Sequence, residues 1–523
     1  MKQIRSYLAG AWHEGHADPI ALVDPATEEV LAQVRPASGL AEAVAFGRTT
    51  GGSNLRAMSL QERREMLGAL AKVLHAHREE LLDLSMTSGG NTRGDAKFDV
   101  DGATAVLAAY GHLGKSLGDG PWIVDGEAVE LMRGSKIRAQ HVLLPRHGLA
   151  VHINAFNFPA WGMVGKLAVS LLAGMPVLTK PATSTSLLAA RMAEIIVESG
   201  LVPEGAFQIL LGPAGDLLDH VGPQDVIAFT GSAATGAAIR GHARVIANNV
   251  RVNIEADSLN AVVIAPDVEP GTELFDLVVR DAVTELTQKA GQKCTATRRI
   301  LVPESLLEAV REAVSERLAA IADKTGTPSD PAVRMGPLST EQQLADARKG
   351  VEVLQRSAER IVGDPGRTSF VGVPDGKGWF IEPILMQATA ASARDPNATF
   401  HHTEVFGPVA TLLPYDGSIE TAAEIISLGQ GSLVTTVYSD DREWTARAVA
   451  ELSPYLGRLV LASEKVAAAS ISPGCVFPVA HHGGPGRAGA GAELGGRVGL
   501  ELYMQRTTLQ GGAAQLARLL GTK

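Results

Sequence analysis

The chain has 523 residues, 45% of them hydrophobic and 20% charged, a composition typical of a globular protein with room for several domains. The 57 acidic residues outnumber the 47 lysines and arginines, which argues against nucleic acid or an anionic membrane as the partner. Two cysteines cannot build a disulfide framework and fit a reducing cytoplasm. The N-terminus has no apolar signal segment, and the longest apolar region, 167–178, is too interrupted to span a bilayer. We therefore expect a soluble cytoplasmic protein.

Helical periodicity dominates residues 40–112, after a short region of strands and turns. Segment 121–147 alternates around Asp-Gly and Gly-Ser turns, which predicts a projecting hairpin or meander. Strands and helices then alternate up to residue 251 and again over 260–470, so we predict an α/β fold with two doubly wound parallel sheets. The first block has expected strands at 149–153, 176–179, 207–211 and 226–229, and expected helices at 160–172, 184–199, 216–221 and 235–243. A late strand is expected over 498–508.

Cys294 lies in a turn of small residues, where a substrate could approach its thiol. The periodicity of residues 274–290 predicts a helix that ends at Gly291, and Ile300–Val302 predicts a strand. An ionised thiol is a nucleophile for carbonyl groups, whereas the alternative is a small buried core cysteine. Glu255 ends a predicted strand and is either a general base or a capping and salt-bridging group.

Three further stretches also follow predicted strands, at the end where open α/β sheets bind ligands. Asn157 could donate its amide to a developing oxyanion, or it could cap a helix. Lys180, with the hydroxyls of Thr183 and Ser184, suits a phosphate or ribose, although a solvated lysine is an equal alternative. Gly231 lets the backbone approach a ligand closely. Together these groups indicate covalent catalysis on a carbonyl with a bound cofactor.

Seven short stretches, in order along nearly the whole chain, resemble motifs of the aldehyde dehydrogenase superfamily. They are Asp24–Thr27, Asn157–Pro159, Lys180–Ala182, Phe229–Ser232, Gly291–Cys294, Met335–Leu338 and Glu404–Pro408. The resemblance implies that Cys294 attacks the aldehyde and carries the resulting thioester. The Asn157 amide and the Cys294 backbone N–H would hold the oxyanion, Glu255 would activate the hydrolytic water, and Lys180 would complete the catalytic set.

The resemblance also implies a nicotinamide dinucleotide site, with Glu404 and Phe406 at the nicotinamide ribose and ring. Its expected residues are Ile153, Asn154, Ala155, Phe156, Lys180, Ala182, Thr183, Ser184, Gly212, Phe229, Thr230, Gly231, Ser232, Thr235, Ala256, Glu404 and Phe406. Many NAD-dependent members carry glutamate at the position of Thr183, where it would repel a 2′-phosphate. We therefore expect NADP, with NAD possible. The family's glycine pair after the general base is replaced here by Ala256-Asp257-Ser258.

By the same resemblance, residues 1–120 and 148–254 form the dinucleotide-binding domain and residues 255–480 the catalytic domain. Segments 121–147 and 481–523 form an oligomerisation element and the tail. We expect a homodimer or a higher homo-oligomer, and a monomer at micromolar concentration in solution scattering would contradict this.

Several patterns are set aside. Gly484–Gly489 satisfies G-x-G-x-x-G without a preceding strand and is interpreted as a loop. His481-His482 lacks an acidic residue or cysteine at ligand spacing, so we expect surface or loop histidines and no metal. Cys475 is interpreted as a spectator beside the active-site mouth.

The C-terminal stretches His481–Arg487 and Gln505–Gly511 resemble the branch of the superfamily that acts on CoA-linked semialdehydes in aerobic aromatic degradation. The expected reaction is oxidation of such a semialdehyde to the acid. Free aldehydes as substrates, a CoA-acylating enzyme and a catalytically silent protein remain as alternatives. A cofactor-free cysteine hydrolase would need a histidine such as His152 or His220, and neither lies in a supporting motif.

Overall fold

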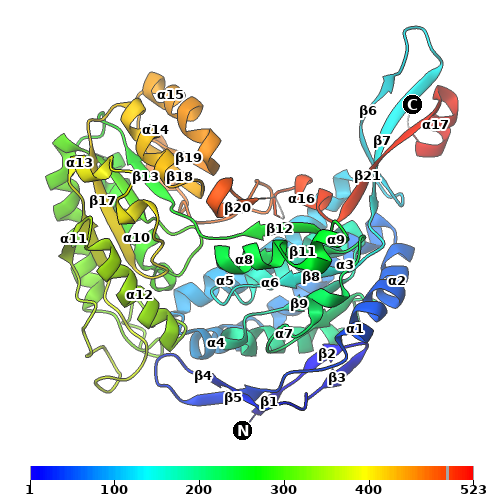
Figure 1. Cartoon of the computed structure of the whole chain (residues 1–523), viewed down its shortest axis with the longest axis horizontal. Helices are drawn as coiled ribbons and strands as arrows, with labels where there is room; N and C mark the ends of the chain where they lie inside the picture. The colour runs from blue at the N-terminus through cyan, green and yellow to red at the C-terminus, as the bar shows by residue number, and fades with distance from the viewer. Residues whose placement is uncertain (1, 491–493, 522–523) are drawn as a thin grey trace.

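The computed structural model describes residues 2–490 and 494–521. Figure 1 shows two α/β lobes side by side, with a narrow arm that projects from one of them and carries the C-terminal region. Each lobe is built on its own sheet with helices on its faces, which confirms the predicted α/β fold with two doubly wound sheets. Among the described residues, no helix combines the length and apolar character that crossing a membrane requires.

The first sheet has the strand order β20-β12-β11-β8-β9-β10-β2-β3. Its strands are β2 (Ser6–Leu8), β3 (Ala11–His13), β8 (Ala150–Ile153), β9 (Val177–Lys180), β10 (Phe207–Ile209), β11 (Val226–Thr230), β12 (Arg251–Glu255) and β20 (Gly489–Ala490). The central strands from β12 to β10 are parallel, and antiparallel strands close both edges. The four strands expected at 149–229 are present to within two residues.

Side chains of this sheet pack alternately into two hydrophobic cores, one on each face, because successive residues of a strand point to opposite faces. Leu149 and Val151 pack in the cluster on one face, whereas Ala150 packs in the cluster on the other. The helices of this lobe are α1 (Leu40–Phe46), α2 (Gly52–Ala57), α3 (Leu60–Ala76), α4 (Arg78–Gly89), α5 (Arg93–Leu113), α6 (Trp161–Ala173), α7 (Ser186–Glu198), α8 (Ala233–Arg240) and α9 (Ala243–Ala247). A small sheet of β1 (Lys2–Ile4), β5 (Val30–Val34) and β4 (Ile20–Val23) lies at the N-terminus.

Two expected helices of the first lobe differ in the structure. Residues 216–221 form only a 3₁₀ turn, Leu217–His220. The helix expected over 235–243 is two helices, α8 and α9, because Gly241 ends the first and the His242 ring accepts a hydrogen bond from the Arg244 N–H to cap the second.

The second sheet has the order β15-β16-β17-β14-β13-β18-β19, and only the pairing of β15 with β16 is antiparallel. Its strands are β13 (Ala261–Ile264), β14 (Arg299–Pro303), β15 (Glu359–Val362), β16 (Ile384–Gln387), β17 (Val409–Tyr415), β18 (Ser432–Tyr438) and β19 (Leu456–Ala462). Its helices are α10 (Glu273–Thr287), α11 (Leu307–Ala322), α12 (Glu341–Leu354), α13 (Ala390–Ala393), α14 (Ile419–Leu428) and α15 (Arg442–Leu452).

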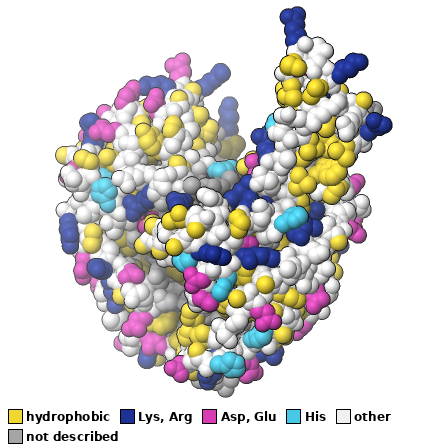
Figure 2. Space-filling model, turned by 45° about the vertical axis from the view of Figure 1, so that its right-hand side comes forward, with side chains coloured by type: hydrophobic (Ala, Val, Ile, Leu, Met, Phe, Trp, Pro, Cys, Tyr) yellow, Lys and Arg dark blue, Asp and Glu magenta, His cyan; other side chains and the backbone are white. Residues whose placement is uncertain are grey.

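The arm is a three-stranded antiparallel sheet of β6 (Ile123–Glu130), β7 (Ile137–Pro145) and β21 (Met504–Gly512), followed by α17 (Ala513–Leu520). The hairpin over 121–147 is therefore confirmed. The late strand was placed too early, because residues 498–501 form the short helix α16 (Val498–Glu501) and the strand starts at Met504. Hydrophobic side chains gather on the arm (Figure 2), with Leu131 and Met132 exposed. Assembly into a homodimer stays a prediction, as do the domain boundaries.

Candidate active site

Cys294 lies in the turn between α10 and β14, but the helix before it is shorter than expected. α10 ends at Thr287, and Lys289 and Ala290 have φ values of 54° and 51°, in the left-handed region. Gly291 follows with φ 68°, and a Cβ there would lie 2.3 Å from the Gly407 carbonyl oxygen. This packing forces the backbone out of the helix, at a cost of about 1–2 kcal/mol for each left-handed residue with a side chain. Such strain concentrates where a structure must aim a functional group.

Buried hydrogen bonds hold the nucleophile turn from several sides. The Asn260 amide donates to the Cys294 carbonyl at 2.7 Å, and the Thr295 hydroxyl donates to the Gly474 carbonyl at 3.0 Å. The Lys293 ammonium pairs with the Glu285 carboxylate at 2.7 Å, and both side chains are almost fully buried. The Glu285 carboxylate also accepts the Gly474 N–H at 3.0 Å. One buried ion pair thus connects α10, the nucleophile turn and the loop at Gly474.

The Lys293–Glu285 pair should matter for stability. Replacement of Glu285 with leucine leaves the Lys293 ammonium buried without its counter-charge, so we expect the free energy of unfolding to fall by about 3–5 kcal/mol. The double variant Glu285→Leu/Lys293→Met should recover most of this loss, since both charges are then removed. Urea unfolding followed by circular dichroism measures the effect.

An exposed pair provides the matched control. Glu308 pairs with Arg311 on the surface of α11, and Glu308→Leu should change the free energy of unfolding by less than about 1 kcal/mol. A double variant at 285 and 293 that is no more stable than Glu285→Leu would contradict the ion-pair explanation.

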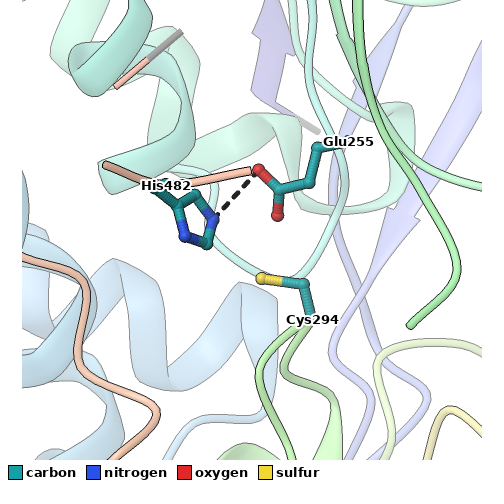
Figure 3. Close-up of side chains that lie close together, drawn as sticks. All are labelled: Glu255, Cys294 and His482. Atoms are coloured by element: carbon teal, nitrogen blue, oxygen red, sulfur yellow. Dashed lines mark ion pairs between the residues drawn. The ribbon is translucent and has the colours of Figure 1, made fainter. Parts of the chain in front are cut away.

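Figure 3 shows Glu255, at the end of β12, beside Cys294 from the other lobe. The Cys294 sulfur and a Glu255 carboxylate oxygen lie within 4.8 Å of each other, and the Glu255 Oε2 atom lies 3.2 Å from the His482 Nε2 atom. Burial alone would raise the pKa of Glu255, but the charge and hydrogen bond of His482, helped by the Lys166 ammonium and the Cys294 thiol, hold that pKa down at about 2. Burial and the adjacent Glu255 carboxylate raise the pKa of Cys294 well above its ordinary value. In the resting cluster the thiol is therefore protonated and the neighbouring carboxylate is ionised.

His482 corrects one of our expectations. It lies in a loop, as expected, but it is buried, with 4% of its surface exposed, and it has an acidic neighbour that is remote in sequence. One donor atom each from Glu255, Cys294 and His482 lies within 4.8 Å of the other two. The expectation of no metal stays a prediction. No spacing pattern around His482 points to Glu255, so the sequence alone could not place it here.

Asn157 lies beside the cluster, in the loop between β8 and α6. Its amide nitrogen donates to the Gln292 carbonyl at 2.9 Å, which leaves its second N–H for another acceptor. The helix-cap alternative is wrong, because α6 starts after Ala160 and the N–H groups of Ala160 and Trp161 donate to the Asp99 carboxylate instead. Lys180 ends β9 and lines the second of two cavities at the site, and its partial burial lowers its pKa.

Two cavities meet at Cys294. One is narrow and largely apolar, and the aromatic side chains of Phe98, Phe158 and Trp161 contribute to its wall. Its remaining lining residues are Ala155, Asn157, Gly162, Lys166, Thr230, Glu255, Cys294, Thr295, Gly474, Val476, His482 and Leu494. The thiol, the carboxylate and the Asn157 amide thus face a channel that suits the chain of an organic aldehyde.

The second cavity encloses about 420 Å³ and lies along the carboxyl ends of the first sheet's parallel strands, where such sheets bind dinucleotides. Expected cofactor residues that line it are Ile153, Asn154, Ala155, Phe156, Lys180, Ala182, Phe229, Thr230, Gly231, Ser232, Thr235, Ala256, Glu404 and Phe406. Thr183, Ser184 and Gly212 are not among its lining residues. Asp257 and Gln343 line it without having been predicted.

The polar groups of this cavity fit a bound ligand. The side-chain oxygens Asn154 Oδ1 and Glu404 Oε1 are buried without hydrogen-bond partners, as expected of groups that await one. Burial raises the pKa of Glu404 to about 7, against the opposing effect of Arg298, whose Nε atom lies 3.6 Å away. Phe406 packs edge-on against Phe156 at 5.7 Å between ring centroids. The cavity can therefore hold a nicotinamide dinucleotide between these groups.

A half-buried thiol beside a carboxylate, between an apolar channel and a dinucleotide-sized cavity, fits an oxidoreductase. Comparison with known proteins assigns the family. The model of the aldehyde dehydrogenase family matches residues 12–509, and the chain belongs to this family. It is therefore an oxidoreductase of aldehydes, and its family uses NAD or NADP.

Individual relatives agree with this assignment. The chain is 43% identical, over 92% of its length and 93% of the relative, to a 3,4-dehydroadipyl-CoA semialdehyde dehydrogenase of Aromatoleum evansii. It is 27% identical to the NADP-dependent succinate-semialdehyde dehydrogenase of Mycolicibacterium paratuberculosis, over 95% of this chain and 98% of that one. Betaine aldehyde dehydrogenase of Staphylococcus aureus, solved with NAD+, shares the fold with a TM-score of 0.82 at 24% identity, covering 98% of this chain and 95% of that one.

Proposed function

We propose that the protein oxidises a CoA-linked semialdehyde, 3,4-dehydroadipyl-CoA semialdehyde, to its carboxylic acid with NADP as the oxidant. The observation that carries the reaction is the Cys294–Glu255 pair at the meeting point of the two cavities. The relative from Aromatoleum evansii supports the substrate. Thr183, which brings no carboxylate that would repel a 2′-phosphate, supports NADP. NAD remains possible as a second cofactor.

The first half of the reaction is attack on the aldehyde. The Cys294 sulfur bonds to the carbonyl carbon while its proton passes to the Glu255 carboxylate, whose low pKa keeps it ionised in the resting enzyme. The free N–H of the Asn157 amide and the Cys294 backbone N–H receive the oxyanion. NADP bound in the second cavity supplies the acceptor for the hydride that leaves the former aldehyde carbon. Cys294 then carries a thioester.

The second half is hydrolysis of that thioester. Glu255, once it has released its proton, accepts a proton from water, and the resulting hydroxide adds to the acyl carbon. The C–S bond breaks, and the carboxylic acid and the Cys294 thiol are restored. Overall, aldehyde, water and NADP+ give acid, NADPH and a proton. A CoA-acylating reaction would need a thiol in place of this water, and a carboxylate in contact with the nucleophile favours water.

The test is turnover of 3,4-dehydroadipyl-CoA semialdehyde by the purified enzyme, followed through the absorbance of the reduced nicotinamide. We expect a kcat/KM with NADP at least about 10-fold above that with NAD, because Thr183 brings no carboxylate that would repel the 2′-phosphate. No turnover of this substrate alongside turnover of simple aliphatic aldehydes would refute the CoA-linked substrate. A dependence on free CoA would show acyl transfer instead of hydrolysis.

The cofactor argument has its own control in the same assay. Thr183→Glu should lower kcat/KM for NADP by about 10²-fold, since a carboxylate would then face the 2′-phosphate. The same variant should leave kcat/KM for NAD almost unchanged. An equal loss with both cofactors would mean that residue 183 does not read the 2′-position.

A further inference from the structure

His482 is held in the active site by the loop that follows the second lobe and returns to the first sheet. β20 of this loop pairs with β12, where Gly489 stands opposite Glu255. The Ala256 N–H donates to the Ala488 carbonyl at 3.1 Å, and the His482 N–H donates to the Leu494 carbonyl at 3.1 Å. The backbone on both sides of the imidazole is thus fixed relative to the strand that carries Glu255.

Close packing keeps this loop in place. Gly489 has φ 105°, and a Cβ there would lie 1.9 Å from the Ile254 carbonyl oxygen, so the loop approaches β12 as closely as only glycine permits. Gly457 is packed as tightly against the carbonyl of Gly483, the residue after His482. The imidazole therefore has little freedom to leave Glu255.

The chemistry of the contact fixes its direction. An ionised carboxylate only accepts hydrogen bonds, so the His482 Nε2 atom, 3.2 Å from Glu255 Oε2, must carry the proton. Among the described residues, the buried Nδ1 atom of His482 has no hydrogen-bond partner, so the ring makes one side-chain hydrogen bond there. The imidazole therefore donates one hydrogen bond from Nε2, and its acceptor is the Glu255 carboxylate that faces Cys294 (Figure 3).

We propose that His482 is a positioning residue, whose imidazole holds the Glu255 carboxylate ionised and aimed at the Cys294 thiol during attack and at the hydrolytic water during thioester hydrolysis. This inference rests on the proposed role of Glu255 as the base. It adds a residue from the C-terminal loop, which acts through Glu255. Glu255 and His482 then work as one unit.

Other charged groups surround Glu255 and His482, and they influence how the pKa of Glu255 responds when His482 is removed. They are Lys166 on α6, Arg458 on β19, Glu404 and Asp257 at the cofactor cavity, Glu285 on α10 and His481 beside the imidazole. Lys166 acts on Glu255 in the same direction as His482 but as the weaker influence. Without His482, the largest influences that lower the pKa of Glu255 are lost while burial still raises it, so that pKa rises from about 2. As the pH falls, Glu255 of the variant is then protonated at pH values where the wild-type carboxylate is still ionised.

The experiment compares His482→Leu, which removes the donor, with His482→Gln, which keeps an N–H near the position of Nε2. Steady-state kcat is measured against pH on any aldehyde that the wild-type enzyme turns over. We expect His482→Leu to lose about 10–100-fold in kcat near neutral pH and to gain an acidic limb that the wild type lacks, with recovery as the pH rises. His482→Gln should restore most of the rate, and His481→Leu, at the exposed neighbour, should match the wild type.

A double-mutant cycle separates positioning from a structural role. If His482 acts only through Glu255, adding His482→Leu to Glu255→Gln should cause no further loss of kcat. A wild-type pH profile in His482→Leu, or losses that multiply in the double variant, would overturn the proposal. Undiminished steady turnover in Glu255→Gln alone would instead refute the proposed role of Glu255. NADPH affinity and thermal unfolding of each variant report whether the fold and the cofactor cavity remain intact, and His482→Gln keeps the test decisive if His482→Leu unfolds.

Discussion

Cys294→Ala should abolish turnover, with a loss in kcat of about 10⁴-fold or more, because removal of a covalent nucleophile leaves only the binding contributions of the site. The affinity for NADPH should remain within about 2-fold of the wild-type value, since most residues of the second cavity lie on the first lobe. Alanine fills part of the same space in a turn that Asn260 and Thr295 hold through other atoms, so the fold should persist. Turnover and NADPH binding, measured on the same preparation, give the two readouts.

The chain provides a matched control in its other cysteine. Cys475 is partly buried, and its carbonyl accepts a hydrogen bond from Arg458 at 2.9 Å, which does not require the thiol. Cys475→Ala should therefore keep kcat within about 3-fold of the wild type, as expected for an uninvolved side chain. Loss of folding in Cys294→Ala would mean that the thiol is structural, and a large loss in Cys475→Ala would end its interpretation as a spectator.

The parts of the site that the sequence could predict share one physical origin. Asn157, Lys180 and Glu255 each follow or end a strand of the first sheet. Parallel strands bring their carboxyl ends to one edge, so residues at these positions must gather there whatever the loops do. The same reasoning gave the strands themselves, because an apolar run between turns leaves few alternatives in an alternating α/β chain.

Other parts depend on contacts that local patterns do not contain. The end of α10 was predicted too late because Gly291 packs against Gly407. Lys289 and Ala290 leave the helix there, although Ala290 fits the helical period. His482 reaches Glu255 through the pairing of β20 with β12, a contact between distant segments. The first residues of the predicted late strand are helical for a similar reason. A short apolar run fits either a helix or a strand, and its tertiary contacts determine which one forms.

Glu255→Gln should separate the two halves of the reaction. The thiol can still attack the aldehyde, more slowly, so we expect a burst of reduced nicotinamide of roughly one equivalent per active site. Hydrolysis of the thioester then lacks its base, and the steady rate should fall by about 10²–10⁴-fold. Stopped-flow absorbance resolves the burst from the steady phase, and mass spectrometry of the stalled enzyme should find the acyl group on Cys294.

The pH dependence of kcat provides a second test of the role of Glu255. In the wild type the pKa of Glu255 is lowered from 4.5 to about 2, so its carboxylate remains ionised down to that value and should impose no acidic limb on kcat near neutral pH. Glu316→Gln, at an exposed position of α11, serves as the matched control and should behave as the wild type. Steady turnover of Glu255→Gln at the wild-type rate, with no acyl group retained, would remove Glu255 from the mechanism. A stalled thioester in Glu255→Gln would instead show that attack and hydrolysis are separate steps that share one carboxylate.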